Sequence, residues 1–212
     1  MGVYTYNDIG GHNKAKHWGC PDTVDTNGLT SMVQVSGQWS VADKPYGISV
    51  SVDGHVIISF SETSTVGVFT HAGVLQRRIA VDPAVVNLRH AVLLATGQLV
   101  ICHGAVQQRA AVSIVDADGH LVKTLAADDR QLVWPTHVAV DERGFIYASD
   151  YSGKRVAQLD RDLAYVADIV GYDDGLRNPR NIGLDSIRRR LYVAQAAGSV
   201  IVFGLQNLLP LY

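Results

Sequence analysis

The chain repeats one pattern of residues four times, and this repeat constrains its fold more than any other feature. The four copies begin at Pro45 ("PYGISVSVDGHVIISF"), Leu88 ("LRHAVLLATGQLVICH"), Pro135 ("PTHVAVDERGFIYASD") and Pro179 ("PRNIGLDSIRRRLYVAQ"). Successive copies therefore start 43, 47 and 44 residues apart. A second alignment gives steps of 46, 44 and 44 residues and rests on four valines, Val66, Val112, Val156 and Val200. Both alignments indicate a repeat architecture with a period of about 44 residues.

Each copy of the repeat has the pattern of four short β-strands. In the third copy the apolar runs are Val138–Val140, Phe145–Ala148, Val156–Leu159 and Tyr165–Val170, and Gly, Asp or Pro separates them. No window shows a sustained period of 3.6 residues, so long helices are not expected. Four antiparallel strands in about 44 residues are typical of a propeller blade. The runs are apolar almost throughout because a blade packed between two others buries both of its faces.

Residues 135–160 also resemble a known repeat. They follow the pattern PxxxxVDxxGxIYxxDxxxxRVxxLD, which is similar to the NHL repeat, and the copy from Pro45 follows it nearly as well. In the second copy Leu88 replaces the leading proline, and in the fourth Ile187, Arg188 and Arg189 replace the turn glycine. The resemblance covers residues 38–204 and implies a β-propeller. It indicates function only weakly, because propellers carry many activities.

The expected fold is therefore an all-β propeller of four-stranded antiparallel NHL-like blades over residues 38–212. Residues 1–37 are expected to form a partial blade with a polar insertion, since 2–7 resembles a third strand and 30–36 lies where a fourth strand belongs. Either four blades close into a ring, or the propeller is partial and open. We favour the open form, because Val3–Tyr6 and Val200–Phe203 would compete for one position in a closed ring. Unpaired blade edges would promote self-association.

Composition and motifs favour a protein without catalytic chemistry or cofactors. The formal net charge of −2 gives no general attraction to nucleic acid or to membranes. There is no apolar run of about 20 residues and no signal-peptide pattern. The two cysteines are far apart in the sequence, which predicts reduced thiols and a cytoplasmic location. Phosphate-binding loops, the serine-hydrolase elbow and HExxH are all absent from the sequence.

Two histidines keep a metal-dependent propeller enzyme, a lyase or hydrolase, as the alternative. His90 and His137 both occupy the third position of their copies. The resemblance matters here, because an NHL-like amidating lyase binds zinc through histidines in this part of its blades. The other two copies have Gly47 and Asn181 at this position, so only two of the three ligands of a catalytic zinc are visible. No metal is therefore predicted, with His90 and His137 as the weak alternative.

The expected binding surface is the top face, where the fourth strand leads to the next first strand and the second strand leads to the third. Cations outnumber acids there and aromatic residues lie among them, a pattern that suits a protein partner or, alternatively, the phosphates and bases of RNA. The NHL domains of tripartite-motif proteins include RNA binders that use this face. We therefore predict a non-enzymatic module that binds protein or RNA, as in the substrate-recognising part of a tripartite-motif-like ubiquitin ligase. The predicted ligand-binding residues are Lys44, Tyr46, Arg89, Arg109, Trp134, His137, Tyr151, Lys154, Arg155, Arg177 and Arg180.

Overall fold

The computed structural model describes residues 38–105, 108–128 and 131–205. The chain divides into two compact units, residues 1–36 and residues 37–212. The partial blade predicted over residues 1–37 lies outside the described residues, as do its segments 2–7 and 30–36. The account below concerns the second unit alone.

Four antiparallel sheets, one for each copy of the repeat, confirm the predicted all-β propeller. Blade 1 contains β1 (Gly47–Val50), β2 (Val56–Phe60), β3 (Thr65–Phe69) and β4 (Leu75–Ala80). Blade 2 contains β5 (His90–Leu93), β6 (Leu99–Ala105), β7 (Gln108–Val115) and β8 (Leu121–Ala126). Blade 3 contains β9 (Pro135–Val140), β10 (Ile146–Asp150), β11 (Arg155–Leu159) and β12 (Tyr165–Val170). Blade 4 has three described strands, β13 (Pro179–Asp185), β14 (Arg190–Gln195) and β15 (Val200–Gly204).

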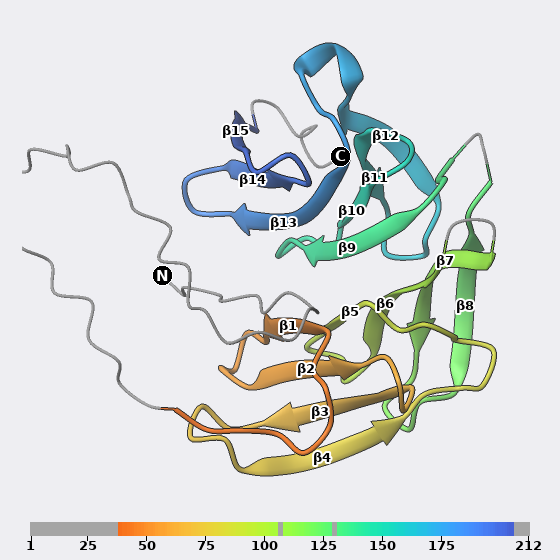
Figure 1. Cartoon of the computed structure of the whole chain (residues 1–212), viewed down its shortest axis with the longest axis vertical. Helices are drawn as coiled ribbons and strands as arrows, with labels where there is room; N and C mark the ends of the chain where they lie inside the picture. The colour runs from red at the N-terminus through yellow and green to blue at the C-terminus, as the bar shows by residue number, and fades with distance from the viewer. Residues whose placement is uncertain (1–37, 106–107, 129–130, 206–212) are drawn as a thin grey trace, which may run out of the picture. The chain divides into compact units, whose positions relative to one another are not determined.

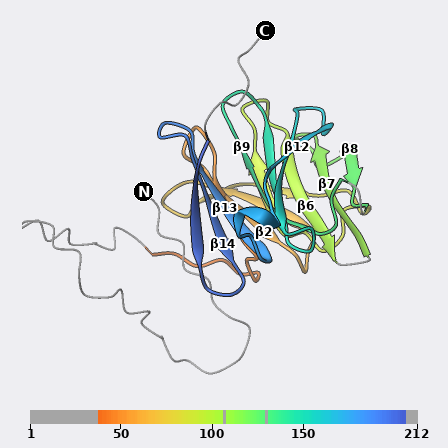
Figure 2. The same cartoon turned by 90° about the horizontal axis from the view of Figure 1, so that it is seen from above.

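Within each sheet the strands pair in chain order, and the first strands of successive blades contact one another. β1 contacts β5, β5 contacts β9, and β9 contacts β13 (Figure 1). The second view shows the same sheets from above (Figure 2). Among the described strands, β13 and β1 share no comparably extensive contact. The only described helix is the 3₁₀ turn η1 (Tyr172–Asp174), and no helix in the described ranges is long and apolar enough to span a membrane.

The hydrophobic core is divided into layers between successive blades. Strand β6 shows the principle, because its side chains alternate between the two faces of its sheet. Leu99 and Ile101 belong to the core shared with blade 1, whereas Val100 and Cys102 belong to the core shared with blade 3. All four are fully buried. Burying a side chain of the size of Leu or Ile contributes about 1.5–3 kcal/mol, so a blade gains most of its stability from its neighbours.

Serine hydroxyls connect neighbouring blades at the start of two inner strands, β5 and β13. Ser59 Oγ on β2 donates a hydrogen bond to the backbone oxygen of Arg89 at 2.8 Å, just before β5. Ser149 Oγ on β10 donates to the backbone oxygen of Arg180, the second residue of β13, at 2.8 Å. Ser59 and Ser149 occupy the same position in their blades. These bonds fix the backbone from which the side chains of Arg89 and Arg180 project. Both residues belong to the predicted binding surface.

The turns between first and second strands show how the fourth copy accommodates its missing glycine. Gly54, Gly97 and Gly144 have φ of 84°, 84° and 85° in the first three blades. Arg189 takes the left-handed conformation in blade 4, with φ of 52°. A residue with a Cβ adopts this region at a cost of about 1 kcal/mol, which the rest of the blade must offset.

Candidate functional site

Five side chains from successive blades form a continuous row of aromatic rings and cations, which we call the aromatic–cation row: Tyr46, Arg89, Trp134, Tyr151 and Arg180. The Arg89 guanidinium lies 5.7 Å from the ring centre of Tyr46 and 4.7 Å from that of Trp134. Trp134 meets Tyr151 edge to face with ring centres 5.1 Å apart, and Arg180 lies 5.6 Å from the Tyr151 ring. The row therefore runs from blade 1 to blade 4 across the top face.

A second group, which we call the Tyr172 cluster, extends the same surface: Lys154, Tyr172 and Arg177. The Arg177 guanidinium lies 3.7 Å from the centre of the Tyr172 ring, and Lys154 Nζ lies 5.2 Å from it. Arg177 Nη1 also donates hydrogen bonds of 2.8 Å to the backbone oxygens of Tyr172 and Leu176. These bonds hold the guanidinium over the exposed ring of Tyr172.

Within the described part of the chain, the cations of these two groups have no acidic partner. Among the described residues, no carboxylate lies within ion-pair distance of Arg89, Lys154, Arg177 or Arg180. Arg89 instead donates to Tyr46 Oη and to the backbone oxygen of Gly104, each at 2.8 Å. A cation–π contact contributes about 0.5–1 kcal/mol at an exposed site and leaves the positive charge uncancelled. The surface therefore combines apolar rings with free positive charge.

A buried carboxylate shapes the middle of the row. Asp150 is fully buried and accepts hydrogen bonds from the backbone N–H groups of Val133 at 2.9 Å, Trp134 at 2.7 Å and Gly153 at 3.1 Å. Arg155 pairs with it, Nε to Oδ2, at 3.1 Å. Four donors on one carboxylate satisfy its buried charge and fix the backbone on which Trp134 is mounted. Asp150 is thus a positioning residue for the row.

The two histidines of the metal hypothesis lie side by side on the inner strands. The rings of His90 and His137 stack with their centres 3.5 Å apart. His90 Nε2 lies 3.1 Å from the backbone oxygen of Ile48 on β1, and its Nδ1 lies 3.5 Å from the backbone nitrogen of Val138 on β9. The neutral ring with its proton on Nε2 satisfies both contacts, so His90 connects blades 1, 2 and 3. Both of its nitrogens are then occupied by the backbone.

Burial keeps these histidines uncharged. It lowers the pKa of His90 to about 4, and burial followed by the proximity of His90 lowers the pKa of His137 well below its usual value. Burial also lowers the pKa of His103 to about 4, and His103 Nε2 lies 2.8 Å from Ser113 Oγ. In the ranges that the structure describes, no group of three His, Cys, Asp or Glu side chains is arranged to hold a metal ion.

The structure gathers most of the predicted binding residues and separates a few. Lys44 lies apart from the row and pairs with Glu62 at 3.0 Å. Arg155 is mostly buried and pairs with Asp150 and with Asp168, so its charge is used within blade 3. His137 is half-buried beneath the surface, against His90. The side chain of Arg109 lies outside the described residues. The row and the Tyr172 cluster contain the other predicted residues, Tyr46, Arg89, Trp134, Tyr151, Lys154, Arg177 and Arg180.

Tyr172 is the residue of this surface that the sequence analysis missed. It follows β12 directly, in the loop that leads to β13, and loops of this kind were assigned to the top face. A signal was therefore present, because "GYDDG" places one large aromatic residue among acidic residues and glycines at the correct position in the repeat.

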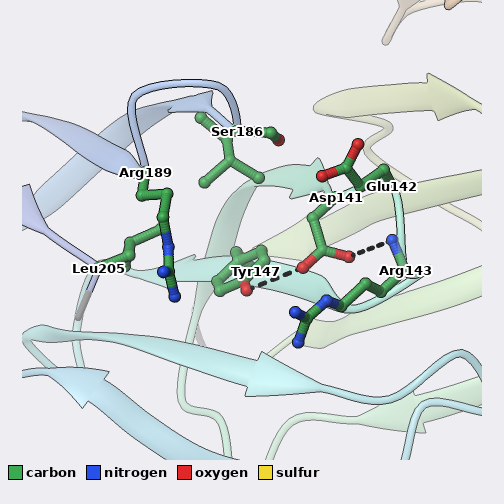
Figure 3. Close-up of a pocket in the computed structure, with 8 residues that line it drawn as sticks. Asp141, Glu142, Arg143, Tyr147, Ser186, Arg189 and Leu205 are labelled. Carbon is green, nitrogen blue, oxygen red and sulfur yellow. Dashed lines mark hydrogen bonds between the residues drawn. The ribbon is translucent and has the colours of Figure 1, made fainter. Parts of the chain in front are cut away.

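A separate pocket of about 230 Å³ lies at the turns between first and second strands of blades 3 and 4. Figure 3 shows Arg143 and Arg189 on either side of Tyr147, whose hydroxyl donates to Asp141 Oδ2 at 3.1 Å. Burial and the Asp141 carboxylate raise the pKa of Tyr147. With Glu142 also in its lining, the pocket carries two acids and two bases, so its charges balance. None of the predicted binding residues lines it.

No protein-family model and no protein of curated function matches this sequence. Similar solved structures include a protein of unknown function from Bacteroides caccae, 12% identical with a TM-score of 0.52, where 79% of this chain matches 59% of that one. Virginiamycin B lyase from Staphylococcus aureus is 15% identical with a TM-score of 0.50, and 77% of this chain matches 56% of it. A streptogramin B lyase is 15% identical with a TM-score of 0.52, and 80% of this chain matches 58% of it.

These likenesses show the fold alone. The chain spans less than 60% of the length of each of these three proteins. They establish that the four sheets are arranged as in known propellers, and they assign this chain no substrate.

Proposed function

We propose that this chain is a non-enzymatic interaction module of the NHL type, which binds a protein partner through the aromatic–cation row and the Tyr172 cluster. The observation that carries this proposal is that four cations lie on aromatic rings without an acidic partner among the described residues: Arg89, Lys154, Arg177 and Arg180. Such charges are available to a ligand, since no ion pair within the described ranges must be broken first.

The chemistry of this surface favours a partner segment with acidic and apolar residues. Guanidinium groups bind carboxylates in planar, two-point geometry, and the rings of Trp134, Tyr151 and Tyr172 offer apolar contact area with few rotatable bonds. Trp, Tyr and Arg are the residues that most often dominate binding energy at protein interfaces. The hydrogen bonds of Asp150 and the serine bonds between blades hold the row rigid, which lowers the entropy cost of binding.

The chemistry of the inner histidines also supports a module over an enzyme. A zinc ligand needs a free ring nitrogen, and the backbone contacts of His90 occupy both of its nitrogens. The resemblance of residues 135–160 to NHL repeats connects the proposal to tripartite-motif proteins. On that basis the partner is a substrate protein that a ubiquitin ligase recognises.

Selection of short random peptides on the immobilised full chain tests the proposal. We expect enrichment of peptides that combine Asp or Glu with apolar residues, with affinity that falls as salt rises. Arg180→Ala and Tyr172→Ala should each weaken a selected peptide about tenfold, which corresponds to about 1.4 kcal/mol. Both side chains are exposed, so these variants should fold normally.

Arg188→Ala is the matched control, because Arg188 lies on the opposite turns and pairs with Asp185 at 3.0 Å. It should leave peptide affinity unchanged. Enriched peptides without acidic residues, or affinities that are insensitive to Arg180→Ala and Tyr172→Ala, would refute the assignment of this surface. If a single-stranded RNA bound in an Arg180-dependent manner and no peptide did, the RNA alternative would replace the protein partner.

A further inference from the structure

The repeat allows the burial of equivalent residues to be compared from blade to blade. Each blade has a forward face, which contacts the next blade in chain order, and a backward face, which contacts the previous one. By strand register, Val200 and Val202 of β15 correspond to Val66 and Val68 of β3, all on forward faces. Val66 and Val68 are buried against blade 2, whereas Val200 is 63% exposed and Val202 is 50% exposed. The forward face of blade 4 is therefore uncovered.

The backward face of blade 1 shows the reciprocal situation. Ile48 of β1 corresponds to three buried residues on the other inner strands, Ala91, Val138 and Ile182. Ile48 itself is 42% exposed, and its neighbour on the same face, Val50, is 51% exposed.

The outer part of this backward face is covered differently. Trp39 stacks on Phe69 with ring centres 5.2 Å apart, and Val41 packs on the same cluster. The uncovered part of the backward face is therefore at the inner strand β1. In the other three blades the inner strand packs against the preceding blade. The two exposed faces are thus localised apolar surfaces and not general features of the outer strands.

The two uncovered faces should be complementary, because one is a forward face and the other is a backward face. A forward face meets a backward face at three places within the chain, and each meeting forms one of the buried cores. Only the forward face of blade 4 and the backward face of blade 1 lack such a meeting in the described part of the chain. A second copy of the chain carries the matching face for each of them.

We propose that two copies of this chain associate head to tail, so that blade 4 of each copy packs its forward face on the backward face of blade 1 of the other. Both junctions form at once under a two-fold axis, which closes the assembly. The matched part of the chain spans 56–59% of each similar propeller, so two copies of that part supply somewhat more than the length of one. Each junction would repeat the contact between a forward and a backward face that occurs three times within the chain.

The first test is the mass of the full chain in solution by sedimentation equilibrium. A closed dimer has twice the chain mass of 22.9 kDa. Ile48→Lys and Val202→Asp place a charge in both junctions and should each shift the protein to monomer. These side chains are exposed in the single chain, so neither change buries a charge during folding.

The pairing itself is tested by combining the two changes in one chain. Val68 and Ala91, the counterparts of Val202 and Ile48, belong to one core between blades 1 and 2. In a head-to-tail dimer the new Lys and Asp therefore lie in the same junction, and the double variant should regain the dimer mass. Val122→Asp on outer strand β8 is the control. Val122 is exposed but belongs to blade 2, so it lies on neither of the two uncovered faces, and this variant should remain dimeric.

A monomeric wild-type chain would overturn the proposal. Dimers that persist in both single variants would overturn it as well. A double variant that stays monomeric would exclude the head-to-tail pairing, since two backward faces meeting each other would bring Lys against Lys.

Discussion

Lowering the pH should unfold this protein over a range set by its buried histidines. His90 is only 2% exposed, and its Nδ1 faces the N–H of Val138, so a second ring proton has no acceptor. Burial therefore holds its pKa at about 4, whereas an unfolded chain has about 6.5. Between these two values the unfolded state binds the proton and the folded state does not. Stability is then complete above pH 6.5 and falls as the pH drops toward 4.

The size of the effect follows from the difference in pKa. The pKa of His90 differs by about 2.5 units between the two states, and each unit corresponds to about 1.4 kcal/mol. The stability that can be lost through protonation of His90 is therefore roughly 3 kcal/mol in total. About 2.5 kcal/mol of this is lost by pH 4.5. His103, with its pKa also lowered to about 4 by burial, adds a similar loss. The sum is comparable to the total stability of a typical domain, about 5–15 kcal/mol.

Urea unfolding at pH 7.5, 5.5 and 4.5, followed by tryptophan fluorescence at one fixed protein concentration, measures this loss. His90→Gln removes one of the three histidines whose pKa burial lowers, and leaves His103 and His137. At pH 7.5 this variant should be less stable than wild type by about 1–3 kcal/mol, because the hydrogen bonds between blades weaken. Between pH 7.5 and 4.5 it should lose about 2.5 kcal/mol less than wild type. Equal losses in the two proteins would refute the claim that His90 is buried uncharged.

Two further predictions concern the contacts that position the row. Asp150→Ala should destabilise the protein by about 3–5 kcal/mol in urea unfolding, because Arg155 and three backbone N–H groups lose their acceptor; a change below about 1 kcal/mol would contradict this role. Ser59→Ala and Ser149→Ala should each cost about 1 kcal/mol by loss of a hydrogen bond between blades, while the exposed Ser186→Ala should cost nothing measurable. Equal stability of all three serine variants would show that these bonds do not hold the blades together.

The sequence predicts the blades well because the repeat imposes the same burial pattern on each. In blade 3 the expected runs Val156–Leu159 and Tyr165–Val170 agree with β11 (Arg155–Leu159) and β12 (Tyr165–Val170) within one residue. The near-continuous apolar character of these runs has the predicted cause, since β6 buries alternate residues in two different cores. Strand positions depend on local patterns that a sequence displays directly.

The partners of individual side chains are a different matter. Arg155 has the same residue type as Arg180, yet one is paired with Asp150 and Asp168 and the other lies on Tyr151. The sequence presents His90 as a candidate metal ligand, whereas the structure gives its nitrogens to the backbone of Ile48 and Val138. Backbone partners from other blades leave no trace in residue identity, so composition and spacing could not reveal them.

The division of the core into three separate layers has a consequence for how the protein comes apart. Separating blade 4 from blade 3 exposes only the layer around Tyr147 and Leu191, and the layers nearer the first blade stay intact. Species with two or three assembled blades are therefore discrete, low-lying states on the path to the unfolded chain. Within a single chain, blades 2 and 3 have a core layer on both sides and blades 1 and 4 share a layer with one neighbouring blade only, so we expect blades 1 and 4 to exchange and to be cleaved first when no second copy is bound. Whatever occupies the two end faces consequently governs the lifetime of the whole molecule.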